Sequence, residues 1–318
     1  MGYHPRIESK DRASFVTTRT RNSELWFANN SPVEEFTLGL LAKLVDRYKI
    51  KLYAFAMEGS HYHLPAHFPL ENRADLTRDF NSGIARAVDR LTPNFPGGKF
   101  WGRRYSAEMI ASDKDIERQF FYTVLQPVSD GLVPRISEYP FYNCFHDAVC
   151  GIKRKHKSVN WGKYNAAKRH NPNLHPKDFT EVYYLSFERL PGYEELSQHE
   201  YRVLMEKKLE EHRQEIIRKR ESEGKFSFLG TEALLKTIPG TPAKNPKRST
   251  RRSHRPRVLS SSNERRAIAK MWYFSIYFKY KKASRRYRAG ELDVEFPPGT
   301  YRPPSWQVVR PSGLYCPI

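Results

Sequence analysis

Residues 58–68, EGSHYHLPAHF, place two histidines, His61 and His63, on either side of one aromatic residue. In a β-strand, side chains two residues apart share a face and lie about 6.5–7 Å apart along the backbone, so two imidazoles there can hold one ion. Tyr62 would then point into the core. A half-buried strand that happens to carry two histidines fits the same triplet. His67 shares the parity of the pair, but Pro65 interrupts the ladder and makes it a weaker candidate.

The chain around this segment alternates between strand and helix patterns. Strands are expected at residues 14–20, 50–57, 61–68 and 100–110, because these runs are β-branched or alternate between polar and apolar residues. Amphipathic helices are expected over about 31–48 and 76–91, where apolar residues recur every three to four positions. The order β-α-β-β-α-β predicts an α+β, ferredoxin-like fold: an antiparallel sheet with helices on one face.

A third helix should follow this unit. It is expected to begin at Ser112 and to run to about Asp130, where Gly131 is a natural stop. Pro127 should kink it, because the proline ring removes a backbone donor and crowds the preceding turn.

Tyr122 and Gln126 lie one turn apart on this third helix and so share a face. Alone, they fit a tyrosine at the edge of the core that finds a hydrogen bond. Two histidines do not close a metal site, and this helix offers a third ligand.

The composition predicts a polyanionic partner. Among 318 residues, 55 Lys and Arg oppose 35 Asp and Glu, which gives a formal net charge of +20, and nucleic acid is the first candidate. No apolar run approaches the roughly 18 residues of a membrane span, and the first residues have no apolar signal-peptide core. Three cysteines without a CxxC pair fit a reducing cytoplasm. A zinc site at Cys144, His146 and Cys150 matches no standard spacing.

Beyond about residue 150 the pattern changes, so we expect two domains, residues 1–150 and residues 151–318. The second is basic and mainly helical, with a long helix at about 198–222, a basic arm at about 241–262 and an aromatic helix at about 267–288. The arm includes Arg251 and Arg252 and is expected to contact DNA phosphates without reading sequence.

Four segments together resemble the single-tyrosine HUH transposases. They are the His-x-His strand, FWGRRYSAEMI (residues 100–110), FYTVLQPVSDGLV (121–133) and SEYPFYNCF (137–145). Their order and spacing over roughly residues 5–150 are most similar to those of the REP-associated tyrosine transposases. Two positions differ from that pattern: Ser60 stands where Asn usually precedes the first histidine, and Gln126 where that branch usually has Asn.

The resemblance implies that Tyr122 is the nucleophile and that His61, His63 and Gln126 bind a divalent ion, Mg²⁺ or Mn²⁺. Arg118 lies one turn before Tyr122 and is either a contact for the phenolate or a solvated surface residue.

Arg103 and Arg104, beside Trp101 and Tyr105, fit a strand that grips a DNA backbone and stacks bases. An edge strand protected from aggregation by its charges fits equally.

These features predict a metal-dependent single-stranded DNA endonuclease and strand transferase that acts at hairpin-forming repeats through a 5′-phosphotyrosine intermediate. The alternative is a domesticated protein that binds DNA hairpins without cutting them. An RNA-binding protein is a third possibility, although the central strands lack an RNP-like aromatic pair. The expected partner is single-stranded or hairpin DNA, with no membrane, for a monomer or homodimer in the cytoplasm of a prokaryote, associated with the nucleoid.

Overall fold

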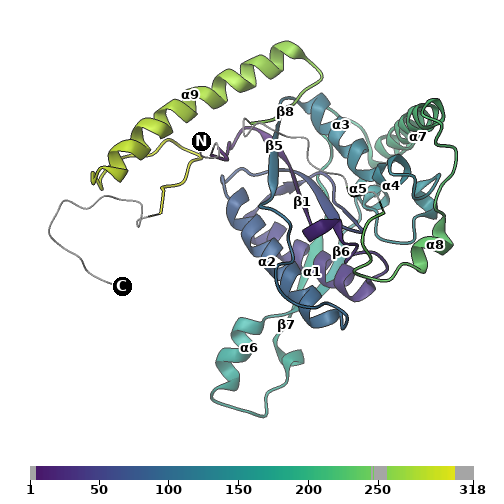
Figure 1. Cartoon of the computed structure of the whole chain (residues 1–318), viewed down its shortest axis with the longest axis horizontal. Coiled ribbons are helices and arrows are strands. Elements are labelled where there is room, and N and C mark those ends of the chain that lie inside the picture. The colour runs from purple at the N-terminus through teal and green to yellow at the C-terminus, as the bar shows by residue number, and fades with distance from the viewer. Residues whose placement is uncertain (1–4, 245, 247–255, 305–318) are drawn as a thin grey trace.

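The computed structural model describes residues 5–244, 246 and 256–304, and its centre is a mostly antiparallel sheet (Figure 1). The strand order is β2-β4-β1-β5-β8, and β3 pairs with β4 next to β2. The strands are β1 (Ala13–Arg19), β2 (Lys51–Leu52), β3 (Ala56–Glu58), β4 (His61–His67), β5 (Ser106–Ile110) and β8 (Val258–Leu259). Among the described strands of this sheet, β5 and β8 are the one pair that runs in parallel. The α+β class and the β-α-β-β-α-β order predicted from the sequence are confirmed.

Helices cover both faces of the sheet. On one face lie α1 (Ser31–Tyr48) and α2 (Arg73–Leu91), and on the other α3 (Asp113–Val124), α4 (Gln126–Ser129), α5 (Phe145–Cys150) and α7 (Gln198–Ser222) (Figure 1). Tyr62 is fully buried against α1 and α2, as predicted, and its hydroxyl donates to Asn81 Oδ1 at 2.9 Å. Because strand side chains alternate, His61 and His63 take the α3 side, with Phe15.

The strand expected at 50–57 is split into β2 and β3. Pro65 on the neighbouring strand has no backbone N–H to offer to this segment, although its carbonyl accepts from Tyr53 N at 3.1 Å. Phe55 N–H donates instead to Cys144 Sγ at 3.3 Å. Burial raises the pKa of the Cys144 thiol to about 12, which keeps it protonated and makes it a poor zinc ligand.

The strand expected at 100–110 begins only at Ser106. Residues 100–102 turn instead along the end of β1. There the Phe100 carbonyl accepts a hydrogen bond from Arg21 N–H, and Gly102 N–H donates to the Arg19 carbonyl. A Cβ added at Gly102 would lie 3.0 Å from the Thr20 carbonyl oxygen, so the chain passes too close for a regular strand with side chains.

The predicted third helix is two helices, because α3 ends at Val124 and α4 starts at Gln126. Leu125 between them has φ −93° and ψ 5°. Pro127 is the physical reason, since its ring cannot continue the hydrogen-bond ladder of α3. The predicted stop at Gly131 is confirmed: φ is +75°, and Leu132 N closes the turn on the Pro127 carbonyl at 2.8 Å.

Gly131→Ala should lower the free energy of unfolding by at least about 1–2 kcal/mol, the typical cost of left-handed backbone for a residue with a Cβ. The new Cβ would also lie 2.6 Å from the Arg220 guanidinium nitrogens. Urea unfolding measures the change. Gly162→Ala, in a helix with the nearest atom at 3.5 Å, is the matched control and should leave stability unchanged or raised. Equal stability of both variants would contradict the prediction.

The chain beyond residue 150 adds a hairpin and several helices. The hairpin of β6 (Arg154–Val159) and β7 (Thr180–Leu185), with α6 (Trp161–Lys168) between its strands, projects from the body (Figure 1). The remaining helices are α8 (Thr231–Leu235), α9 (Asn263–Arg288) and short 3-10 turns at Arg21–Ser23, Ile136–Glu138 and Pro176–Phe179. Leu185 and Tyr201 pack in the same two cores as the first 150 residues. The division at residue 150 stays a prediction.

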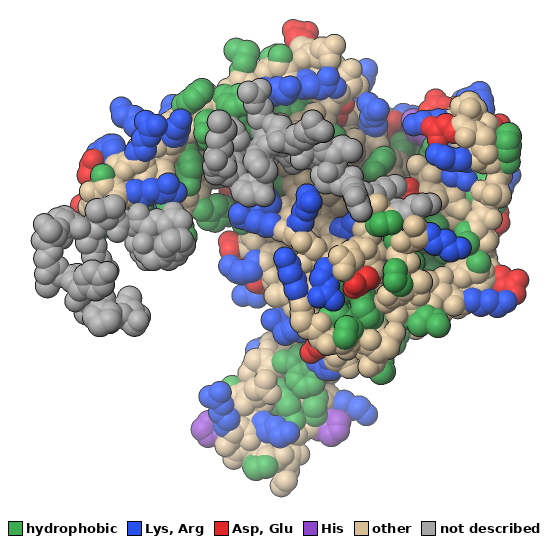
Figure 2. Space-filling model, viewed as in Figure 1, with side chains coloured by type: hydrophobic (Ala, Val, Ile, Leu, Met, Phe, Trp, Pro, Cys, Tyr) green, Lys and Arg blue, Asp and Glu red, His purple; other side chains and the backbone are tan. Residues whose placement is uncertain are grey.

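The long helix expected at 198–222 is α7, which is capped by Ser197 and Glu200. The aromatic helix expected at 267–288 begins earlier, at Asn263, because the Ser262 side chain caps it. Residues 245 and 247–255 of the predicted basic arm lie outside the described residues, and β8 forms near the end of the arm. Lys and Arg side chains are spread over the face shown in Figure 2, including α9 and the projecting hairpin. Within the described ranges, no helix is long and apolar enough to cross a membrane.

Candidate active site

Tyr122 is the exposed residue among the buried aromatic residues of α3. Its side chain is 46% exposed, whereas Phe120 and Phe121 beside it are buried. The Tyr122 ring lies edge-on against His63 on β4, with centroids 5.6 Å apart, and against Phe15 on β1, at 5.7 Å. Phe15 also stacks on His63 at 5.2 Å. The two strands therefore form a floor of rings under a tyrosine that remains accessible from solvent.

Gln126, the first residue of α4 after the helix break, interacts with Tyr122. The Gln126 side chain is buried, and its hydrogen bond to the Tyr122 phenol partly offsets the rise in the phenol pKa that burial causes. The Gln126 Oε1 atom has no hydrogen-bond partner among the described residues. A buried amide oxygen without a partner is costly, so Oε1 fits a position where a cation is bound.

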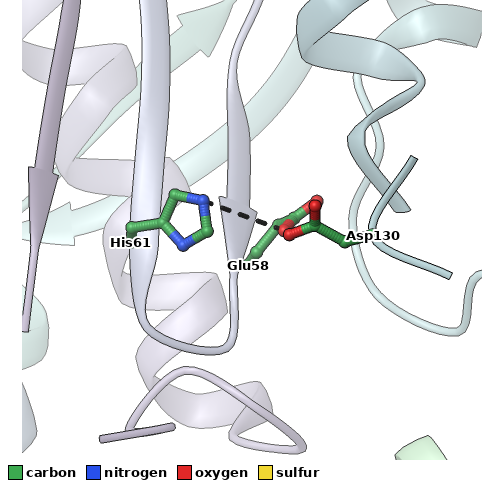
Figure 3. Close-up of side chains that lie close together, drawn as sticks. All are labelled: Glu58, His61 and Asp130. Atoms are coloured by element: carbon green, nitrogen blue, oxygen red, sulfur yellow. Dashed lines mark ion pairs between the residues drawn. The ribbon is translucent and has the colours of Figure 1, made fainter. Parts of the chain in front are cut away.

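A second group of potential ligands lies beside this pair. Glu58 and His61 are opposite each other in the β3–β4 register, and Asp130 follows the end of α4. One ligand atom from each of the three lies within 4.8 Å of the other two, and His61 Nε2 is 3.9 Å from Glu58 Oε2. Figure 3 shows the three side chains converging from two strands and a helix end. They line a cavity of about 190 Å³ together with Arg19.

The donor atoms suit a divalent cation. Carboxylate oxygens are hard ligands that Mg²⁺ and Mn²⁺ accept, and imidazole suits Mn²⁺. The centroids of the His61 and His63 rings are 4.8 Å apart, so the two histidines predicted from the sequence are neighbours. His61 belongs to both possible ligand sets: the predicted His61, His63 and Gln126, and the structural cluster with Glu58 and Asp130.

Sequence reasoning missed Glu58 and Asp130. Glu58 stands three residues before His61 across a two-residue turn, which places it opposite His61 in a tight hairpin. Asp130 continues the four-residue spacing of Tyr122 and Gln126. Both signals were present in the sequence, but only the packing of α4 against the sheet brings Asp130 to the hairpin.

The charges around Tyr122 oppose its ionisation. Loss of solvent around the ring raises the pKa of the Tyr122 phenol most, followed by the negative charges of Asp130, Glu58 and Glu108. The phenol is therefore protonated at neutral pH, because even an unperturbed tyrosine has a pKa near 10. A cation near Glu58 and Asp130 would offset these charges and favour the phenolate.

Asp130→Asn should lower the pKa of the Tyr122 phenol in metal-free buffer, because it removes a negative neighbour. The phenolate would then form at a lower pH than in the wild type. The difference in absorbance titration between each protein and its Tyr122→Phe derivative isolates this one group. Asp89→Asn, exposed on α2 across the sheet, should leave the pKa unchanged. A Tyr122 titration that is identical in all three backgrounds would contradict the prediction.

The segment before β5, predicted from the sequence to contact DNA, is only partly exposed. Arg103 and Arg104 are exposed, but they lie in a bend before β5 rather than on a strand. Tyr105 is buried in the core over α2, so its ring is not presented for base stacking. Trp101 is half-buried at the edge of that core and donates its indole N–H to the Asn81 carbonyl at 2.9 Å, so base stacking on Trp101 stays a prediction.

Three further predicted residues remain. Arg118 is exposed one turn before Tyr122. Arg251 and Arg252 lie outside the described residues. The weaker candidate His67 lies at the far end of β4, where its Nε2 is 2.5 Å from the Lys10 carbonyl oxygen.

Comparison with solved structures finds transposases. One is a REP-associated tyrosine transposase bound to a REP hairpin, with 20% sequence identity and a TM-score of 0.40 over 47% of this chain and 86% of that one. Another, from Deinococcus radiodurans R1 and provisionally assigned as a transposase, has 14% identity and a TM-score of 0.27 over 34% of this chain and 85% of its own. No protein-family model and no curated protein matches the chain.

Proposed function

We propose that this chain is a metal-dependent nuclease and strand transferase for single-stranded DNA that acts at hairpin-forming repeats, with Tyr122 as its nucleophile. One observation carries the proposal: the exposed Tyr122 lies against His63 and forms a hydrogen bond with Gln126. The negative charges of Glu58 and Asp130 are close enough to raise the pKa of its phenol. A structural tyrosine would not need carboxylates and imidazoles gathered beside a partly exposed ring.

A divalent cation would be held by His61 together with Glu58 and Asp130, with His63 and Gln126 Oε1 as the adjoining donors. When bound, it supplies positive charge that stabilises the negative charge developing on the scissile phosphate. The Gln126 amide keeps the phenol oriented through their hydrogen bond.

The reaction is a transesterification. The Tyr122 oxygen forms a bond to phosphorus while the bond to the 3′ oxygen breaks; the phenol loses its proton and the departing oxygen gains one. The products are a 5′-phosphotyrosine and a free 3′-OH. Because the covalent link retains a phosphodiester bond, a second 3′-OH can reverse the step and join a new strand without ATP.

The test is incubation of the full chain with labelled single-stranded hairpin DNA and Mn²⁺, followed by a denaturing gel. A labelled band at the mass of the protein plus the attached DNA fragment is the expected result. If hairpins of several different sequences bind tightly but none forms an adduct, the chain is instead a protein that binds DNA hairpins without cleaving them.

A further inference from the structure

The exposed residues of α3 form one stripe that leads away from Tyr122. After the first helical residue, the solvent-exposed positions of α3 are Lys114, Arg118 and Tyr122, which recur every four residues and so share one face. The intervening residues of the helix are buried or half-buried. Two cations therefore precede the proposed nucleophile in a line along the helix axis.

This stripe ends at a cavity of about 500 Å³. Three cations from separate parts of the chain line it: Arg12 before β1, Lys114 on α3 and Arg265 on α9, with Asp113 as the one acid. The start of α9 is held there because Ser261 N–H donates to Asp115 Oδ1 at 2.6 Å and β8 pairs with β5. Arg12 also lies over the Trp272 ring of α9, 5.3 Å from its centroid.

Stability does not account for these cations. Lys114 and Arg265 lie in the first turns of their helices, where the helix dipole disfavours positive charge. Arg12, Lys114, Arg118 and Arg265 form no ion pair within the described part of the chain. Other surface cations do pair with acids, for example Arg78 with Asp75 and Arg213 with Glu210. Unpaired cations at an unfavourable helix end point to an anionic ligand.

We propose that the backbone of the bound single strand runs along α3 from Tyr122 past Arg118, and that the cavity at Arg12, Lys114 and Arg265 binds one of its phosphates. This inference rests on the proposed function, because it takes the strand held at Tyr122 as the occupant. Lys114 and Tyr122 are about 12 Å apart along the helix axis. That distance corresponds to about three or four nucleotides at the ~3.4 Å rise of a stacked strand.

The experiment measures binding of fluorescein-labelled oligo-dT over a series of NaCl concentrations, with EDTA present and Tyr122→Phe in every protein so that no strand is cut. For single strands, the slope of log K against log[salt] changes by about 0.7 for each phosphate contact. Because the cavity binds one phosphate, the pair Lys114→Gln and Arg265→Gln should flatten the slope by about 0.7, and Arg118→Gln should add about 0.7.

The control pair is Lys51→Gln and Arg86→Gln. Both residues are exposed, Arg86 lies on α2 across the sheet, and the pair removes the same total charge. Its slope should match that of the parent. Equal flattening in the two pairs, or none in the cavity pair, would overturn the inference. The adduct assay with wild-type protein separates the two proposals. If an adduct forms but the slope does not change selectively in the cavity pair, the nuclease function stands and the proposed strand path is wrong. If the slope changes selectively but no adduct forms, the strand path stands and the nuclease function is wrong.

Discussion

Tyr122→Phe should abolish the covalent protein–DNA adduct while the protein stays folded and binds hairpin DNA as before. Phenylalanine keeps the ring, and with it the contacts to His63 and Phe15. What is lost is the hydroxyl and its hydrogen bond to Gln126, which is worth about 1 kcal/mol. Residue 122 then has no oxygen to bond to phosphorus, so we expect adduct below detection on a denaturing gel, with unchanged circular dichroism.

The matched control is Tyr184→Phe, because Tyr184 on β7 is exposed to a similar degree, 55% against 46%. Tyr142→Phe is a second control; it loses a hydrogen bond of 3.0 Å to Asp147 but lies outside the proposed chemistry. Both should retain activity within several-fold. The label should stay on the protein when it is placed on the 5′-phosphate side of the cut. An adduct that persists in Tyr122→Phe and disappears in another tyrosine variant would place the nucleophile elsewhere.

Excess EDTA should also remove adduct formation entirely, with hairpin binding largely retained, because phosphate contacts to cations supply most of the affinity for DNA. Mn²⁺ should restore activity at least as well as Mg²⁺, since the site combines imidazole with oxygen donors. Full activity in EDTA would exclude a role for His61 and His63 in binding an essential ion.

Single substitutions then decide which ligands hold the ion. If Glu58, His61 and Asp130 bind it, Glu58→Gln and Asp130→Asn should each weaken Mn²⁺ binding by at least about tenfold, the lower end of what is lost even when an outer-shell partner is removed. Electron paramagnetic resonance of free Mn²⁺ in the Tyr122→Phe background measures this without activity. If only His63→Gln and Gln126→Leu weaken binding, the ligand set is the one that the sequence motifs imply. Asp89→Asn is the charge-matched control and should bind Mn²⁺ normally.

Much of the local structure follows from the sequence alone. The periodicity of apolar residues places α1, α2 and α7, and the alternation in HYH decides that Tyr62 faces one side while His61 and His63 face the other. These features depend on residues within a turn or two of each other, so a linear pattern contains them.

Two departures of the strands from prediction involve partners distant in the chain. Residues 53–55 leave the sheet because Cys144 and Pro65 meet the backbone there, and residues 100–105 bend because Gly102 passes against the end of β1. No local pattern in either segment reports those neighbours.

The candidate site divides in the same way. The sequence by itself determined that two imidazoles share a strand face and that Tyr122 and Gln126 share a helix face, since both spacings are properties of single elements. Only the tertiary structure decided that these faces meet, that Glu58 and Asp130 join them, and that Arg12 and Arg265 close a cavity on Lys114. The physical reason is that the docking of α3 against β4 and of β8 beside β5 is set by packing between segments far apart in the chain, which no spacing within one segment encodes.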